Sequence, residues 1–104
     1  MRILILERNL IWSSRLSNSA RLLDHEATVA TALPETLDYD VAIINLAYPD
    51  PPVEKLQAAG VKVVAHAGHK ETEKLKLGKV AGCDLVVTNS ELTHKMADVL
   101  ARLA

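Results

Sequence analysis

The predicted fold is organised around YDVAIINLAYP, residues 39–49. Its apolar run from Val41 to Ile44 shows no alternation of apolar and polar residues, which is typical of a strand covered on both faces in the middle of a parallel sheet. Asp40 precedes this run, and the prolines that follow Tyr48 cannot continue a strand. The strand therefore places Asn45 at its C-terminal end, the edge where open α/β sheets bind ligands.

The composition fits one small domain. The 104 residues suffice for one hydrophobic core, so we expect a single domain over residues 1–104. Hydrophobic residues make up 49% of the chain and aromatic residues only 3%, so the core must be aliphatic. A net charge of −1 gives no basic face for nucleic acid. One cysteine, no apolar run of membrane-spanning length and no signal-peptide pattern predict a cytoplasmic protein with no nucleic-acid or membrane partner.

Four further strands are predicted at residues 3–6, 25–31, 61–65 and 84–87. Apolar residues at helical spacing predict helices at residues 10–23 and 91–103. Two further helices are predicted at residues 51–59, which begin with a proline and are followed by Gly60, and at residues 70–81, which are followed by Gly82. Residues 33–38, which join the second strand to the central one, have room for a single helical turn. This alternation predicts an α/β fold: a doubly wound five-stranded parallel sheet with a shortened or missing second helix.

The same spacing predicts the buried helix faces. The buried face of the first helix is predicted to carry Trp12, Leu16, Ala20 and Leu23. Ile11 and Leu22 lie off that face and are expected to be exposed. A solvated face is predicted for Ser13, Ser14, Ser17, Asn18 and Ser19. The buried face of the last helix is predicted to carry Leu92, Met96, Val99, Leu100 and Leu103.

Over nearly its full length the chain resembles the response-regulator receiver domains of two-component signalling, which are CheY-like and flavodoxin-like in fold. The run ILILER, residues 3–8, is similar to the family's first strand and the acidic pair after it. Residues 40–49 are similar to the segment with the phosphorylated aspartate and a proline four positions later, and GCD, residues 82–84, to the turn before the fifth strand. The resemblance implies the strand order 2-1-3-4-5.

The resemblance fails at the residues that the family uses for phosphorylation. Asn45 stands where the family has its phosphorylated aspartate, and an amide lacks the nucleophilic carboxylate oxygen. Glu7 keeps one of the acids that bind Mg²⁺, but Arg8 replaces the other with a cation that would repel the metal. The resemblance therefore implies a degenerate pseudo-receiver without the catalytic residues of phosphoryl transfer.

Two further family positions are changed. The phosphate-binding lysine falls on Asn89, and the switch threonine or serine falls on Ala65 or His66. With the strand order of receivers, one edge of the sheet should bring together Glu7, Arg8, Asn45, His66 and Asn89. These residues would form either a retuned pocket or an inert remnant in which Arg8 pairs with Glu7 and both asparagines bond to loop backbone. We expect the remnant, because such polar groups commonly satisfy each other locally.

The sequence gives little support for a metal site or a bound cofactor. His66 and His69 form a His-x-x-His pair expected in a loop, whereas catalytic zinc takes three protein ligands and an open position. Cys83 precedes the fifth strand, at the opposite end of the sheet from the site, and is expected to be a buried core residue. The scarcity of aromatic residues argues against a bound flavin. We therefore expect no metal and no cofactor.

The sequence favours a non-catalytic pseudo-receiver that acts as a phosphorylation-independent protein–protein interaction module in signal transduction. Its partner would be another protein, such as a kinase, an output or a regulatory protein, or a second copy. The chain ends with the last helix, so we expect it to act without an attached output domain. Receivers generally meet partners through the fourth helix, fifth strand and last helix, which implies a mixed-charge face without large exposed apolar side chains; the candidate residues are Lys74, His94, Lys95, Asp98 and Arg102.

Two other classes remain open. The first alternative is a small-molecule or metal-binding regulator that uses His66, His69, Glu7 and Asn45. The second is an enzyme of the flavodoxin-like group. A hydrophobic dimer seam formed by Ile11 and Leu22 on the first helix competes with the mixed-charge face.

Overall fold

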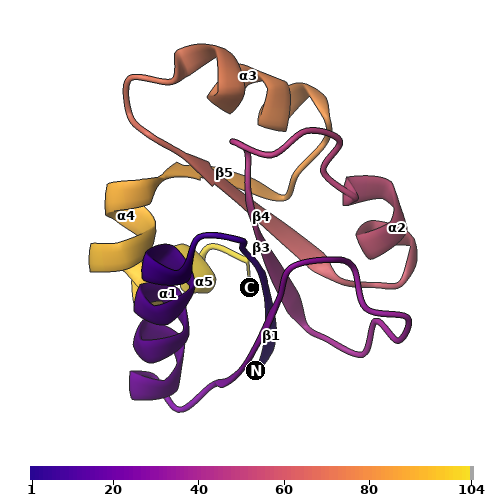
Figure 1. Cartoon of the computed structure of the whole chain (residues 1–104), viewed down its shortest axis with the longest axis vertical. Coiled ribbons are helices and arrows are strands. Elements are labelled where there is room, and N and C mark those ends of the chain that lie inside the picture. Colours follow the sequence, from indigo (N-terminus) through magenta and orange to yellow (C-terminus); the bar gives the residue numbers. More distant parts are fainter. Residues whose placement is uncertain (104) are drawn as a thin grey trace.

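Five parallel strands form one sheet in the order β2-β1-β3-β4-β5 in the computed structural model, which describes residues 1–103. The strands are β1 (Arg2–Leu6), β2 (Glu26–Ala30), β3 (Val41–Asn45), β4 (Lys62–Ala67) and β5 (Leu85–Thr88). The helices are α1 (Leu10–Leu22), α2 (Val53–Ala58), α3 (Thr72–Val80), α4 (Asn89–His94) and α5 (Met96–Ala101). The predicted doubly wound sheet with β3 at its centre is confirmed (Figure 1).

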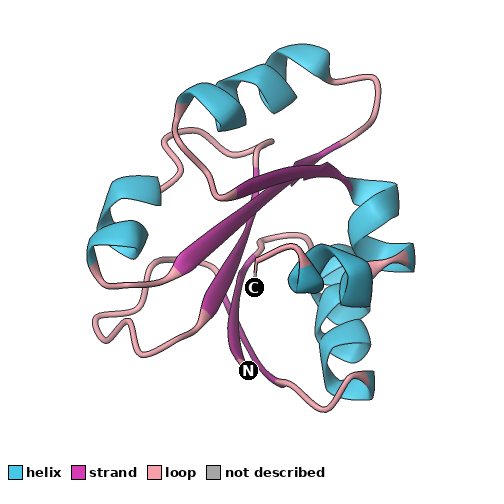
Figure 2. Cartoon of the chain, turned by 180° about the vertical axis from the view of Figure 1, so that it is seen from behind, coloured by secondary structure: helices cyan, strands magenta, loops and turns pink. Residues whose placement is uncertain are grey.

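Helices cover both faces of the sheet, as Figures 1 and 2 show. On one face, α1, α4 and α5 pack against alternate strand residues such as Ile5 and Ile43. On the other face, α2 packs against the intervening residues, which include Leu4 and Ile44. All residues of β3 from Val41 to Ile44 are buried. This two-sided burial explains the continuous apolar run of the central strand.

The second helix of the predicted fold is absent, because residues 31–40 contain no helix. Three apolar side chains of this connection, Leu33, Leu37 and Tyr39, pack on the α2 face of the sheet instead. The loop is also tied to the start of β1, where the backbone N–H of Arg2 donates to the Asp40 carboxylate at 2.7 Å. A short loop thus covers part of a face that a helix would otherwise cover.

The buried face of α1 differs in part from the prediction. Leu16 and Ala20 are buried as expected, but Leu23 is 37% exposed. Ser13 and Ser17 are buried, so the prediction of a fully solvated serine face is wrong for these two. Each hydroxyl donates to a backbone carbonyl three residues earlier, at 3.1 and 3.2 Å. The hydroxyls are satisfied inside the helix itself, which allows small polar residues to face the sheet.

The chain after β5 forms two short helices, and the prediction of one continuous helix is wrong. Lys95, with φ −133° and ψ 37°, leaves the helical region and separates α4 from α5. The predicted apolar face nevertheless stays continuous, since Leu92, Met96, Val99 and Leu100 are all buried. The side chain of Thr88 accepts a hydrogen bond from the Glu91 N–H at 3.1 Å and caps α4.

Helix α3 contacts the sheet closely at Gly78, its one buried residue. A Cβ atom at this position would lie 2.9 Å from Cδ1 of Leu46 and 3.2 Å from Cγ2 of Val86, so a larger residue would force these side chains to shift. Leu77 and Val80 on α3 are 65% and 85% exposed. The prediction of a surface without exposed apolar side chains is therefore wrong at α3. No helix within residues 1–103 is long and apolar enough to cross a membrane.

Candidate functional site

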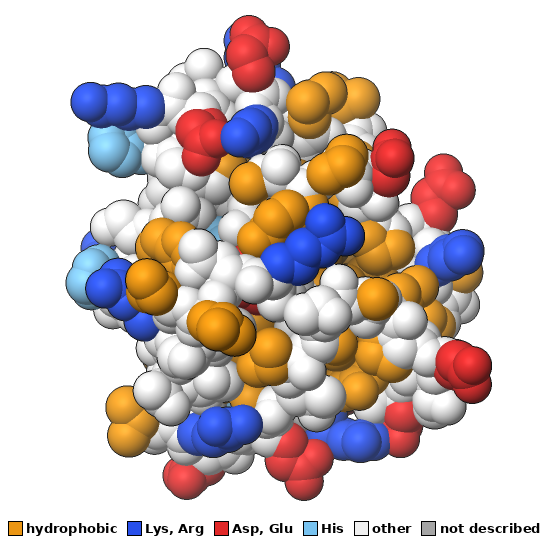
Figure 3. Space-filling view, in the orientation of Figure 1, with side chains coloured by type: hydrophobic (Ala, Val, Ile, Leu, Met, Phe, Trp, Pro, Cys, Tyr) orange, Lys and Arg blue, Asp and Glu red, His pale blue; other side chains and the backbone are white. Residues whose placement is uncertain are grey.

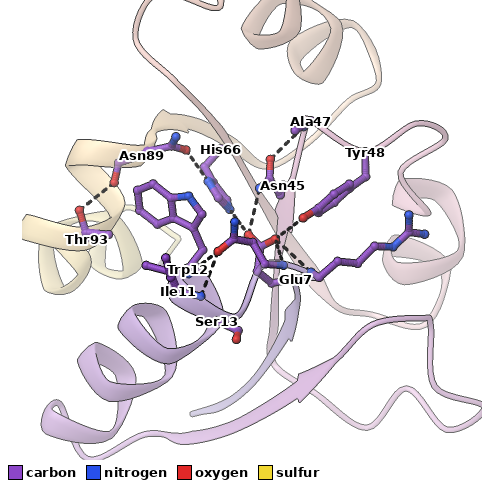
Figure 4. Close-up of polar contacts among 12 residues, drawn as sticks. Glu7, Ile11, Trp12, Ser13, Asn45, Ala47, Tyr48, His66, Asn89 and Thr93 are labelled. Atoms are coloured by element: carbon purple, nitrogen blue, oxygen red, sulfur yellow. Dashed lines mark hydrogen bonds and ion pairs between the residues drawn. The ribbon is translucent and has the colours of Figure 1, made fainter.

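The ends of three neighbouring strands and the start of α4 bring polar side chains together. Glu7 follows β1, Asn45 ends β3, His66 lies in β4, and Asn89 is the first residue of α4. Asn45 and His66 are direct neighbours in the register of β3 and β4. Figure 4 shows that the side chains of these residues and of Tyr48 point toward one another. The structure thus places four of the five predicted side chains in one cluster.

Glu7 is the centre of this cluster, and its carboxylate is fully buried. One oxygen, Oε1, accepts a hydrogen bond from Nδ2 of Asn45 at 3.0 Å. The other, Oε2, accepts from the Tyr48 hydroxyl at 2.9 Å and from the backbone N–H groups of Arg8 and Asn9 at 3.0 and 3.2 Å. Neutral donors therefore satisfy the buried carboxylate. Their hydrogen bonds offset the unfavourable free energy of removing this group from water.

Asn45 uses both ends of its side-chain amide. Its Nδ2 donates to Glu7, and its Oδ1 accepts from the backbone N–H of Ala47 at 2.9 Å. A carboxylate at position 45 could accept the second hydrogen bond but could not donate the first, since an ionised acid has no N–H or O–H group. The amide therefore fits this environment, and an aspartate would face the Glu7 carboxylate directly.

Arg8 does not pair with Glu7, and that prediction is wrong. The Arg8 guanidinium lies over the ring of Tyr48, 5.0 Å from the ring centroid. Partial burial and the hydrogen bond to the Glu7 carboxylate raise the pKa of Tyr48, because both favour the neutral phenol. Tyr48 is not among the site residues predicted from the sequence. The sequence feature that could have identified it is its position: an aromatic residue in the loop directly after the central strand, in a chain with few aromatic residues.

His66 is a core residue and not the loop residue that the sequence predicted. It is 1% exposed, and its Nδ1 lies 2.6 Å from Oδ1 of Asn89. Its Nε2 lies 3.7 Å from Oε1 of Glu7 and has no hydrogen-bond partner within residues 1–103. Burial lowers the pKa of His66, opposed by the bond to Asn89 and by the Glu7 charge. The side chain of Asn89 therefore bonds to a histidine, whereas loop backbone was expected.

The metal-binding alternative has no ligand set in the described part of the chain. His69 lies in an exposed loop, while His66 is enclosed and packs beside Trp12, with ring centroids 6.3 Å apart. Within residues 1–103 no group of three or more His, Cys, Asp or Glu side chains is placed to hold a metal ion. Cys83 is half-buried against the α2 face of the sheet, and burial raises the pKa of its thiol. A thiol with a raised pKa is a poor nucleophile.

The residues proposed as a partner face lie on α3, α4 and α5. Those after β5 are exposed, as predicted, and comprise His94, Lys95, Asp98 and Arg102. Lys74 on α3 pairs with Glu71, and Arg102 pairs with Glu91 at 3.1 Å. Ile11 and Leu22, the competing apolar pair on α1, are 65% and 85% exposed. Both candidate surfaces are therefore accessible.

The fold aligns with solved structures, although neither family models nor curated proteins match the sequence. The receiver domain of the TMAO respiratory system response regulator TorR has a TM-score of 0.76 and 17% identity, over 99% of this chain and 98% of that one. The fold is that of receiver domains. The *Vibrio cholerae* chemotaxis protein CheY4 aligns similarly, with a TM-score of 0.75 and 15% identity over 99% of this chain and 98% of that one.

A third neighbour belongs to a streptococcal family of redox sensors that evolved from two-component response regulators. It has a TM-score of 0.76 and 19% identity over 98% of this chain, which spans only 50% of that protein. At identities this low, the likeness to all three establishes the receiver fold. The likeness does not extend to the chemistry of the site, which depends on the residues of this chain.

Proposed function

We propose that this chain is a pseudo-receiver: a regulatory module of signal transduction that binds another protein or a second copy of itself without being phosphorylated. The observation that carries the proposal is the hydrogen bond from Nδ2 of Asn45 to the buried carboxylate of Glu7. In the receiver fold the end of β3 is where the family carries its phosphorylated aspartate. Here that position holds an amide that is engaged at both ends.

The surroundings of Asn45 support the same proposal. The Glu7 carboxylate, which would be needed as a metal ligand, is surrounded by four hydrogen-bond donors. Asn89 takes the place of the family's phosphate-binding lysine and bonds to His66. Without a covalent switch, the conformation of the domain would be set by binding alone, through a shift between states that already exist.

The first prediction is that the protein takes no phosphoryl group from acetyl phosphate or phosphoramidate in the presence of Mg²⁺. The reason is that Asn45 offers no anionic oxygen to attack phosphorus. The measurement is the mass of the intact protein, beside a receiver domain that carries the aspartate as a positive control. A stoichiometric increase by one phosphoryl group, on Asp40, Asp50 or any other residue, would contradict the proposal.

The second prediction concerns the partner face. Charge reversal by Lys74→Glu and Arg102→Glu should weaken partner capture or self-association at least about fivefold, because rim charges steer association and set the register of a contact. The melting temperature should stay nearly unchanged, since exposed ion pairs such as these add little to stability. The measurements are pull-down from host extract and sedimentation velocity at increasing protein concentration.

Lys62→Glu is the matched control, because Lys62 is exposed at the start of β4, at the opposite end of the strands from the site. It should leave association unchanged. Ile11→Asp and Leu22→Asp test the apolar surface of α1. If these two abolish association and both reversals leave it intact, the partner binds α1 and the mixed-charge face is the wrong choice.

A further inference from the structure

A surface cavity of about 670 Å³ opens at the C-terminal ends of β1 and β3, and its lining includes Glu7, Asn45 and Tyr48 of the site. The strand order reverses between these two strands, and open α/β sheets bind ligands at such a switch point. The loop that replaces the second helix forms one wall, through residues 31–33. The volume lies in the range of pockets that enclose small organic molecules.

The floor of the cavity is apolar. It is lined by Leu6, Leu33, Ile44 and Val53, which come from β1, the β2–β3 connection, β3 and α2. Figure 3 shows hydrophobic side chains gathered over α2 and this connection, with a basic side chain lying across them. A ligand that fills the cavity should therefore present an apolar body to the protein.

Arg8 gives the cavity a cation without an ion-pair partner. Its guanidinium lies over the ring of Tyr48, and no ion pair engages it within residues 1–103. The neighbouring Glu7 forms no ion pair with it, and the oxygens of that carboxylate accept hydrogen bonds from other donors instead. A guanidinium stacked on a ring keeps the edge of its planar fork free for two parallel hydrogen bonds to a carboxylate or sulfonate.

The other charges of the cavity limit the ligand to a single negative charge. Lys55 is a second cation, but three acids, Glu7, Asp50 and Glu54, also line the cavity. No acid of the described chain lies within ion-pair distance of Arg8 or Lys55. The three acids would repel a multiply charged group such as a phosphate more strongly than a single carboxylate.

We propose that this cavity binds a small organic monoanion with an apolar body, whose acidic group pairs with Arg8. The ligand site is separate from the partner face on α3 to α5 and does not depend on it, because it involves different residues. Occupancy would fix the loop after β3 and the β2–β3 connection relative to each other, which supplies a binding-driven route to a change of state.

The test uses three probes with the same naphthalene body and different charge: naphthoate, naphthylmethanol and naphthylmethylammonium. Titration calorimetry and amide chemical shifts should show naphthoate bound to residues around the cavity with a Kd below about 1 mM. The alcohol should bind about tenfold more weakly, and the ammonium more weakly still, because each loses the charge-assisted bonds to Arg8.

Two variants locate the site. Arg8→Gln should lower the affinity for naphthoate about tenfold, to that of the alcohol. Arg15→Gln is the matched control, since its guanidinium also lies over a ring, that of Trp12 at 5.7 Å, outside the cavity lining. Ala32→Trp, at an exposed position of the wall, should abolish binding of all three probes by filling the cavity. The absence of saturable naphthoate binding, equal binding of the alcohol, or an Arg8→Gln variant with unchanged affinity would each overturn the proposal.

Discussion

Replacing Glu7 with alanine should lower the free energy of unfolding by about 2–4 kcal/mol, a large part of the stability of a small domain. The physical reason is that removal of the carboxylate leaves buried hydrogen-bond donors without an acceptor. The amide of Asn45, the hydroxyl of Tyr48 and two backbone N–H groups all donate to it and would lose their acceptor together. Unfolding by urea, followed by circular dichroism at neutral pH, measures the effect.

Glu7→Gln separates the acceptor from the charge. The glutamine carbonyl can replace the oxygen that accepts three donors. Its amide then replaces the other oxygen, where it can face the unpartnered Nε2 of His66 but cannot accept from Nδ2 of Asn45. This variant should therefore lose only about 1 kcal/mol. Glu26→Ala, at an exposed acid of β2, is the control and should lose less than that. Equal effects of Glu7→Ala and Glu26→Ala would show that the hydrogen-bonded cluster does not stabilise the fold.

The arrangement of strands and helices was predictable because it follows from burial patterns along the chain. A run buried on both faces, residues 41–44, can only lie inside a sheet that has helices on both sides. A shortened or missing second helix was predictable from length alone, since residues 33–38 have room for no more than one helical turn. The positions of Glu7, Asn45 and Asn89 followed from the rule that parallel strands end at a common edge.

The contacts within the site were less predictable, because they depend on side-chain directions that no periodicity encodes. The position of Arg8 next to Glu7 in the sequence suggested an ion pair. The two side chains instead point in different directions: that of Glu7 is buried, and that of Arg8 lies over Tyr48. The break at Lys95 had no signal in the sequence, since lysine favours helices. His66 was placed in a loop because β4 extends two residues further than its apolar run, to Ala67.

Asn45→Asp should destabilise the protein by roughly 2–4 kcal/mol at pH 7.5, although it introduces the residue on which receivers are phosphorylated. The substitution replaces the Nδ2 donor, now 3.0 Å from Oε1 of Glu7, with a second carboxylate oxygen. Two carboxylates at this distance cannot both stay ionised without strong repulsion. Asn45→Leu, which removes the donor without adding a charge, should be less destabilising, by about 1–2 kcal/mol.

The dependence on pH and a second substitution identify the cause as repulsion. In the folded Asn45→Asp variant the pair of carboxyl groups should retain a proton that the unfolded chain releases at neutral pH, so stability relative to the wild type should recover as the pH falls toward about 5. Adding Glu7→Gln to Asn45→Asp should restore stability, the opposite of its effect in the wild type, because the glutamine amide can donate to the new carboxylate. If the loss of unfolding free energy does not depend on pH, or if the effects of the two substitutions are additive, the destabilisation results from packing. Repulsion between carboxylates would then not explain why position 45 carries an amide.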